Sequence, residues 1–271
     1  MLPNNGFQGE EHQPFFWPGG KAAVLFVHGF PGTPAEMRPL AESLHRAGWT
    51  AQGILLPGFG NQIETLLERT NEDWLSAVTS ALAQLQREHA PVLVVGYSLG
   101  GALALQAAAR YSPTGLVVLS PFWKVEHVLW ALLPVLKPIF RGVRPFKMLK
   151  LDLGNPEVRA GIQNFWPDAD LDDPQVQAVI RDFRLPLALF DQIKRAGGQG
   201  SRAARSITSP TLIIQGDADE LVRPALTRRL LDRFSVRPRY VEVSGGHDLL
   251  LPDKPAWAEV ERAVHEFAMS L

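Results

Sequence analysis

Short apolar runs alternate along the chain with longer segments in which apolar residues recur at helical spacing. Several of the runs are apolar throughout instead of alternating with polar residues. That pattern is typical of strands covered on both faces, as in a parallel sheet between helices. The runs lie at 22–27, 50–55, 92–95, 116–119, 211–214 and 240–243. The chain is therefore predicted to have an α/β fold with a mostly parallel central sheet flanked by helices.

Helical spacing between these runs predicts the covering helices. Apolar residues recur at that spacing from Met37 to Leu44, from Trp74 to Leu85 and from Val260 to Leu271, and a slim, alanine-rich segment runs from Leu99 to Tyr111. Before the first of these, Thr33-Pro34-Ala35-Glu36 has the pattern of a capping box with proline at the first helical position. We therefore expect Glu36 to cap a helix.

One stretch, from residue 121 to about residue 206, breaks the alternation. It contains eight prolines and no convincing strand. We expect a helical cap at 121–206, inserted after the strand ending near Ser120, with 1–120 and 207–271 forming the core. Gly197-Gly198-Gln199-Gly200 predicts a flexible break near the return to the core.

Large apolar residues gather in this predicted cap. They either line an acyl pocket beneath it or form the cap's own core, and the sequence leaves both possibilities open. The candidate substrate-binding residues are Phe122, Trp123, Leu129, Trp130, Phe165 and Trp166. The apolar stretch 128–140 is broken by prolines. We therefore expect a buried cap helix there, in preference to an amphipathic lid that binds lipid droplets or membranes.

Composition narrows the functional classes. The 271 residues are 46% hydrophobic and 20% charged, with a formal net charge of −1, so nothing favours a nucleic-acid partner. The first residues lack a basic region followed by an apolar one, and no run is long enough for stable membrane insertion, so we expect a cytoplasmic protein. The oligomeric state is left open.

Several kinds of chemistry lack their motifs. The chain has no cysteine, no H-E-x-x-H motif and no histidine pair at ligand spacing, and its glycines do not form a phosphate or dinucleotide loop. We therefore expect no metal and no cofactor.

The segment Gly96-Tyr97-Ser98-Leu99-Gly100 directly follows an apolar run and opens the alanine-rich helix. This is the context of a nucleophile elbow, in which glycines two residues before and after the serine permit a tight strand-to-helix turn. Ser98 is the candidate nucleophile.

A serine hydroxyl needs a base, and the base needs an orienting carboxylate. Among the seven histidines, His247 follows the last predicted strand, in a loop that can carry it over the sheet edge. The preceding strand leads to Asp217 and Asp219, giving the chain order serine, acid, histidine. Spacing alone does not choose between the two aspartates.

Four segments together resemble the α/β-hydrolase superfamily, and most of all its bacterial carboxylesterase and monoacylglycerol-lipase-like branch. They are 28–32 (HGFPG), 96–101 (GYSLGG), 216–222 (GDADELV) and 246–248 (GHD). The resemblance implies that Asp219 is the catalytic acid and that His28 belongs to the oxyanion loop. It also implies that the main-chain N–H groups of Phe30 and Leu99 form the oxyanion hole.

The resulting hypothesis is a serine esterase. Ser98, His247 and Asp219 would cleave a small apolar ester with a short or medium acyl chain, by way of an acyl-enzyme. The same three residues would also suit a thioesterase, an amidase or a carbon–carbon bond hydrolase. A receptor that binds an apolar molecule without catalysis is the alternative from another class.

Overall fold

The central sheet has seven strands in the order β1-β3-β2-β4-β5-β6-β7. The structure is a computed structural model that describes residues 7–124, 159, 170–182 and 187–271. β1 pairs antiparallel to β3, and every other pairing is parallel. The strands are β1 (Phe15–Trp17), β2 (Ala23–Val27), β3 (Thr50–Ile54), β4 (Val92–Tyr97), β5 (Gly115–Leu119), β6 (Thr211–Gly216) and β7 (Arg239–Val243). The expected mostly parallel sheet is confirmed, and each predicted run is a strand to within two residues.

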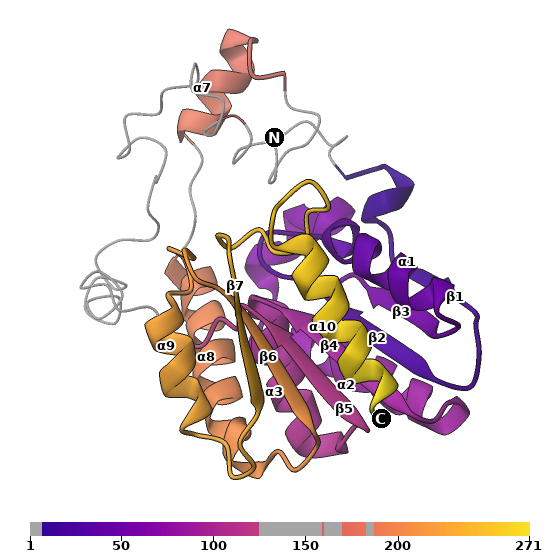
Figure 1. The fold of residues 1–271 in the computed structure, drawn as a ribbon. Helices are drawn as coiled ribbons and strands as arrows, with labels where there is room; N and C mark the ends of the chain where they lie inside the picture. Colours follow the sequence, from indigo (N-terminus) through magenta and orange to yellow (C-terminus); the bar gives the residue numbers. More distant parts are fainter. Residues whose placement is uncertain (1–6, 125–158, 160–169, 183–186) are drawn as a thin grey trace.

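Helices cover both faces of the sheet (Figure 1). The described helices are α1 (Arg38–Arg46), α2 (Asn71–Glu88), α3 (Leu99–Tyr111), α7 (Pro174–Asp182), α8 (Leu187–Ala203), α9 (Pro224–Leu231) and α10 (Trp257–Met269). Short 3-10 helices are η1 (Glu10–His12), η2 (Pro34–Met37), η3 (Gly60–Glu68) and η4 (Ala204–Ser206). None of the helices described is both long and apolar enough to cross a membrane.

Successive side chains along the strands point to opposite faces of the sheet and pack into two separate apolar clusters. On β2, Ala23, Leu25 and Val27 face one apolar cluster, which also holds residues of α2, α3, α8 and α9. Val24 and Phe26 face the other cluster, with residues of α1 and α10. Because successive strand residues point to opposite faces, a strand packed on both sides must be apolar at every position. This explains the uninterrupted apolar runs in the sequence.

The glycine-rich segment of α8 is not the predicted flexible break. Residues 197–200 lie inside the helix, with Gly197 against the main chain after β5 and Gly200 against α3. A Cβ at Gly200 would lie 2.6 Å from the carbonyl oxygen of Ala102, and one at Gly197 would lie 2.8 Å from that of Trp123. These glycines therefore permit close packing of the last helix of the predicted cap against the core. Among the described residues of 121–206 there is no strand, as expected.

Candidate active site

Parallel pairing brings four loops to one edge of the sheet. Val27 at the end of β2 pairs with Gly96 near the end of β4, and Gly216 at the end of β6 pairs with Val243 at the end of β7. The loops that leave these strands carry the candidate residues. In a parallel α/β sheet, this carboxyl edge is where ligands and substrates bind.

Ser98 sits in a sharp turn between β4 and α3. Its φ of 51° and ψ of −113° are unusual for a residue with a side chain, and such strain is often found at functional sites. Neighbouring backbone fixes the turn, since the Ser98 N–H donates to the Leu119 carbonyl at 2.9 Å and its carbonyl accepts from Phe122 N–H at 3.1 Å. A Cβ at Gly96 would lie 2.5 Å from the carbonyl oxygen of Gly100, so the turn requires glycine.

Asp219 and His247 are in direct contact. Nδ1 of His247 lies 2.7 Å from Oδ2 of Asp219, and the Asp219 side chain is fully buried. An ionised carboxylate only accepts hydrogen bonds, so the hydrogen of the neutral ring lies on Nδ1. Nε2 is therefore left with a lone pair that can accept a proton.

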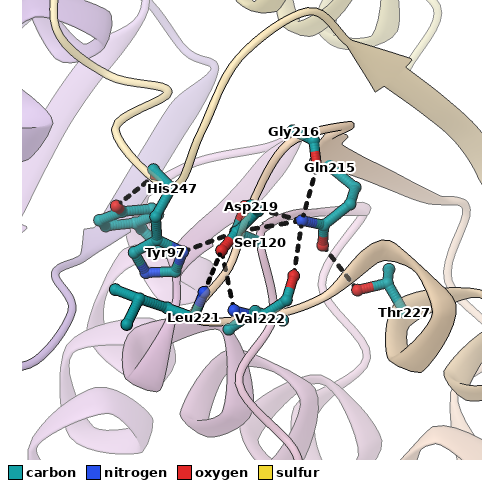
Figure 2. Close-up of polar contacts among 9 residues, drawn as sticks. All are labelled: Tyr97, Ser120, Gln215, Gly216, Asp219, Leu221, Val222, Thr227 and His247. Carbon is teal, nitrogen blue, oxygen red and sulfur yellow. Dashed lines mark hydrogen bonds and ion pairs between the residues drawn. The ribbon is translucent and has the colours of Figure 1, made fainter.

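The Asp219 carboxylate is surrounded by donors (Figure 2). Oδ1 accepts from the N–H groups of Leu221 and Val222 at 2.9 and 2.8 Å, and Oδ2 accepts from Nε2 of Gln215 at 3.0 Å as well as from His247. Burial by itself raises the pKa of Asp219, but the hydrogen bonds and the His247 charge outweigh it, and the pKa is lowered. The carboxylate is thus held ionised although it is buried.

Tyr97, the residue before the candidate nucleophile, connects β4 to the histidine loop. Its hydroxyl donates to the His247 carbonyl at 2.6 Å, and the two rings are 5.1 Å apart (Figure 2). The hydrogen bonds that the structure describes for Ser98 are made by its main chain and do not include one from its hydroxyl to His247. The structure thus joins Asp219 to His247 and joins His247 to the residue next to Ser98.

Asp217, the other candidate acid, has a different environment. It is exposed, and its Oδ1 accepts from the Gly245 N–H at 3.0 Å. This bond fixes the turn that precedes His247, without contact to the imidazole.

The loop after β2 is organised by His28. Its Nε2 accepts from the Leu56 N–H at 3.0 Å, so Nδ1 carries the hydrogen and donates to the Gly29 carbonyl at 2.9 Å. Burial lowers the pKa of His28 to about 4, and the bond to Gly29 only partly opposes this. The carbonyl of Gly29 and the N–H of Phe30 belong to one trans peptide plane and point in opposite directions. The neutral imidazole therefore orients the Phe30 N–H.

Glu36 does not complete the predicted capping box. The Thr33 hydroxyl accepts from Ala35 N–H, as a cap should, but the Glu36 carboxylate turns away and accepts from the Gly29 N–H. The buried N–H of Gly29 needs an acceptor, and the Glu36 carboxylate supplies it. Glu36 therefore supports the same loop as His28.

The second predicted oxyanion donor, Leu99, is the first residue of α3. N–H groups in the first turn of a helix lack acceptors within the helix, and the positive end of the helix dipole favours an anion there. Both predicted donors thus belong to elements that leave the carboxyl edge, one after β2 and one after β4.

The predicted substrate-binding residues fall into two groups. Leu129, Trp130, Phe165 and Trp166 lie outside the described residues. Trp123 is buried in the core, where its Nε1–H donates to the Leu226 carbonyl at 3.0 Å, and Phe122 is half-buried against the same cluster. Phe122 also donates its N–H to the Ser98 carbonyl at 3.1 Å, which places its main chain beside the elbow. A substrate-binding role for Phe122 and Trp123 stays a prediction.

Sequence reasoning missed Gln215 and Tyr97. Gln215 is a polar residue that directly follows the apolar stretch from Leu212 to Ile214, and it is completely buried. A polar residue that directly follows a buried apolar run was the available signal, because buried amides need partners.

Comparison with known proteins places these features in a family. A family model described as "Serine aminopeptidase, S33", of the hydrolase class, matches residues 19–251. A thermostable monoacylglycerol lipase from Bacillus sp. (strain H-257) is 28% identical over 213 residues, which cover 78% of this chain and 76% of that lipase.

Solved structures support the same fold. One, from work on the metagenome-derived lipolytic enzymes LipS and LipT, superposes with a TM-score of 0.75 at 21% identity and covers 97% of this chain and 99% of its own. A monoacylglycerol lipase from Paleococcus ferrophilus gives a TM-score of 0.66 at 23% identity, covering 95% of this chain and 98% of its own. At such identities, the likeness establishes the fold alone.

Proposed function

The chain belongs to the S33 serine aminopeptidase family of hydrolases and has the α/β-hydrolase fold, and on that premise we propose that it is a serine esterase acting through Ser98, His247 and Asp219. The observation that carries the proposal is the 2.7 Å bond between Asp219 and His247. It lies at the sheet edge to which the strained turn delivers Ser98. An acid–base pair beside an elbow serine is the arrangement that acyl transfer requires.

In the first half of the reaction, Ser98 Oγ attacks the ester carbonyl carbon and its proton passes to Nε2 of His247. The imidazolium is stabilised by Asp219. Negative charge forms on the carbonyl oxygen, where the N–H groups of Phe30 and Leu99 stabilise it. The carbon–oxygen bond to the alcohol then breaks, and the alcohol leaves with the proton from His247.

In the second half, water takes the role of nucleophile and Ser98 becomes the leaving group. His247 takes a proton from water, which attacks the acyl-enzyme carbonyl, and the returning proton restores the Ser98 hydroxyl as the acid is released. Each proton taken by His247 is given back, so the histidine and aspartate end the cycle unchanged.

We propose an uncharged ester with an apolar acyl group as the substrate. Phe30 and Phe122, both partly buried, follow β2 and β5, the two strands that flank β4 and its elbow. The similar protein from Bacillus sp. is named a monoacylglycerol lipase, which also fits an apolar acyl chain. The predicted cap, residues 121–206, would supply the rest of the pocket.

Turnover of p-nitrophenyl esters of graded acyl length, beside thioester and anilide analogues, tests the proposal. The wild type should hydrolyse the esters, and Ser98→Ala should lower kcat by roughly 10⁴- to 10⁶-fold. Ser80→Ala is the matched control, because Ser80 is exposed on α2. It should retain full activity.

A fluorophosphonate probe gives an independent readout. It should label the wild type and Ser80→Ala but not Ser98→Ala. Preference for the anilide or the thioester would replace the ester assignment with an amidase or a thioesterase. Absence of both labelling and turnover in the wild type would favour a non-catalytic receptor.

A further inference from the structure

Gln215, in β6, has a completely buried side chain whose amide is saturated with partners (Figure 2). Its Oε1 accepts from the Thr227 hydroxyl at 2.6 Å. Its Nε2 lies 3.0 Å from Oδ2 of Asp219, 2.9 Å from the Val222 carbonyl oxygen, 3.2 Å from that of Gly216 and 3.4 Å from the Ser120 hydroxyl.

These contacts determine which way the amide points. The carboxylate and the two carbonyls around Nε2 can only accept, so the NH₂ group must face them. The hydroxyl of Thr227 can donate, and it faces Oε1. Thr227 is itself completely buried on α9.

The amide acts on the oxygen that His247 uses. Oδ2 of Asp219 accepts from both Gln215 Nε2 and His247 Nδ1, whereas Oδ1 accepts from the main-chain N–H groups of Leu221 and Val222. Two donors from different directions fix Oδ2 in position, and the bond from Gln215 also stabilises the ionised form. Loss of the Gln215 bond would remove one of the two donors that lie within 3.0 Å of Oδ2.

We propose that Gln215, oriented by Thr227, is a positioning residue that aims the Asp219 carboxylate at His247. The inference rests on the proposed function, because it assigns Gln215 a role in that same reaction. Thr227, Gln215, Asp219 and His247 then form one continuous hydrogen-bonded chain from α9 through β6 to the histidine loop (Figure 2).

The burial of an amide at this position supports a role beyond packing. The preceding strand residues Leu212, Ile213 and Ile214 are buried and apolar, so an apolar side chain would continue the strand without a desolvation cost. Gln215 instead requires the hydroxyl of Thr227, twelve residues later in the chain, as the donor to its amide oxygen. Gln215 and Thr227 are thus two buried polar side chains at positions where apolar side chains would also pack.

Three variants test the proposal. Thr227→Val keeps the shape but removes the donor, Thr227→Ser keeps the donor, and Gln215→Met keeps the length but removes the amide. We expect Thr227→Val and Gln215→Met to lower kcat about tenfold to a hundredfold with KM unchanged, because misplacing a reacting group costs about this much. Thr227→Ser should retain wild-type kcat.

The second readout is the proton NMR signal of the His247 Nδ1–H, which lies far downfield while its bond to Asp219 is short. It should move upfield or exchange away in Thr227→Val and Gln215→Met and stay in place in Thr227→Ser. A merely structural role would lower the melting temperature of the variants without moving this signal in the folded protein.

Folded Thr227→Val with wild-type kcat and an unshifted signal would overturn the proposal, even if Gln215→Met does not fold. Failure of the proposed function is distinguishable from this. In that case neither the wild type nor any variant would hydrolyse the esters, while the NMR signal would still show whether Gln215 and Thr227 hold Asp219 against His247.

Discussion

Two loops at the carboxyl edge of the sheet bury ionisable side chains, one after β2 and the other after β6. In the first, burial raises the pKa of Glu36 to about 7, opposed by a single bond from the Gly29 N–H, and lowers the pKa of His28 to about 4. In the second, the pKa of Asp219 is lowered although burial opposes it, because His247, Val222 and Ser120 contribute hydrogen bonds. The first loop favours neutral groups and the second favours a charge.

The difference lies in the number of donors that reach each carboxylate. Desolvation penalises the charged form in both places, and only hydrogen bonds and opposite charges offset it. Glu36 has one described donor, and Asp219 has four at 3.0 Å or less. In the proposed mechanism, an ionised Asp219 is needed beside His247. A negative charge on Glu36, in the loop that carries Phe30, would instead oppose the oxyanion that the Phe30 N–H stabilises.

Removing the charge from the second loop should have the largest effect. Asp219→Asn can place an amide NH₂ where Oδ2 now accepts hydrogen bonds from Gln215 and His247. Nδ1 of His247 would then have to accept, so the ring hydrogen would move to Nε2, where the mechanism needs a lone pair. We expect kcat for ester hydrolysis to fall by about 10⁴-fold with a small change in KM. Steady-state kinetics on the p-nitrophenyl esters measures this.

Asp217→Asn is the control for that experiment. Asn keeps an oxygen that can accept from the Gly245 N–H, so activity should remain near that of the wild type. An equal loss in both variants, or full activity in Asp219→Asn, would contradict the assignment of the acid.

Replacing Glu36, in the loop after β2, by a residue that does not ionise should stabilise the protein at high pH. The usual Glu value is 4.5, so between pH 4.5 and 7 the folded protein binds more protons at Glu36 than the unfolded chain does. The free energy of unfolding therefore falls as pH rises through this window and levels off above it. Glu36→Gln keeps an acceptor for Gly29 but does not ionise. It should gain about 3 kcal/mol over the wild type at pH 8 and almost nothing at pH 4.5.

Urea unfolding of both proteins at several pH values measures this difference. Glu42→Gln is the matched control, because Glu42 is exposed on α1 and lies 4.0 Å from Arg46. Its difference from the wild type should be small and nearly constant over the same range. A constant offset for Glu36→Gln would contradict the raised pKa, because it would mean that the Glu36 carboxyl binds protons equally in the folded and unfolded states.

Local patterns were sufficient to predict the elements that carry the site. Ser98 could be placed at a strand-to-helix turn because the sterics of Gly96 and Gly100 and the change of period from strand to helix are both local signals. His247 and the two aspartates could be placed at the same edge because parallel strands end together. Their mutual contacts come from the structure.

Distant partners explain what the sequence did not predict. Glu36 has the spacing of a helix cap, but a buried Gly29 N–H seven residues earlier takes its carboxylate. Residues 197–200 have the composition of a break, but packing against α3 keeps them helical. β1 has three residues, too few to show alternation, and it forms because β3 offers an open edge. In each case a tertiary contact outweighs the local preference.

An ion pair at the surface gives the smallest expected effect and sharpens the contrast between the two loops. Glu242 accepts from Nε and Nη2 of Arg228, both at 2.7 Å, and from the Tyr240 hydroxyl at 2.6 Å, and the Arg228 bond is the main cause of its lowered pKa. It thus has nearly as many donors as Asp219, but the Arg228 side chain is 58% exposed. Water can replace the lost donors, so Arg228→Met should lower the free energy of unfolding by less than about 1 kcal/mol, and by still less at high salt. Urea unfolding at low and high salt measures both values. A loss for Arg228→Met as large in size as the gain expected for Glu36→Gln at pH 8 would mean that donor number alone, without burial, sets the energetic importance of a carboxylate in this protein.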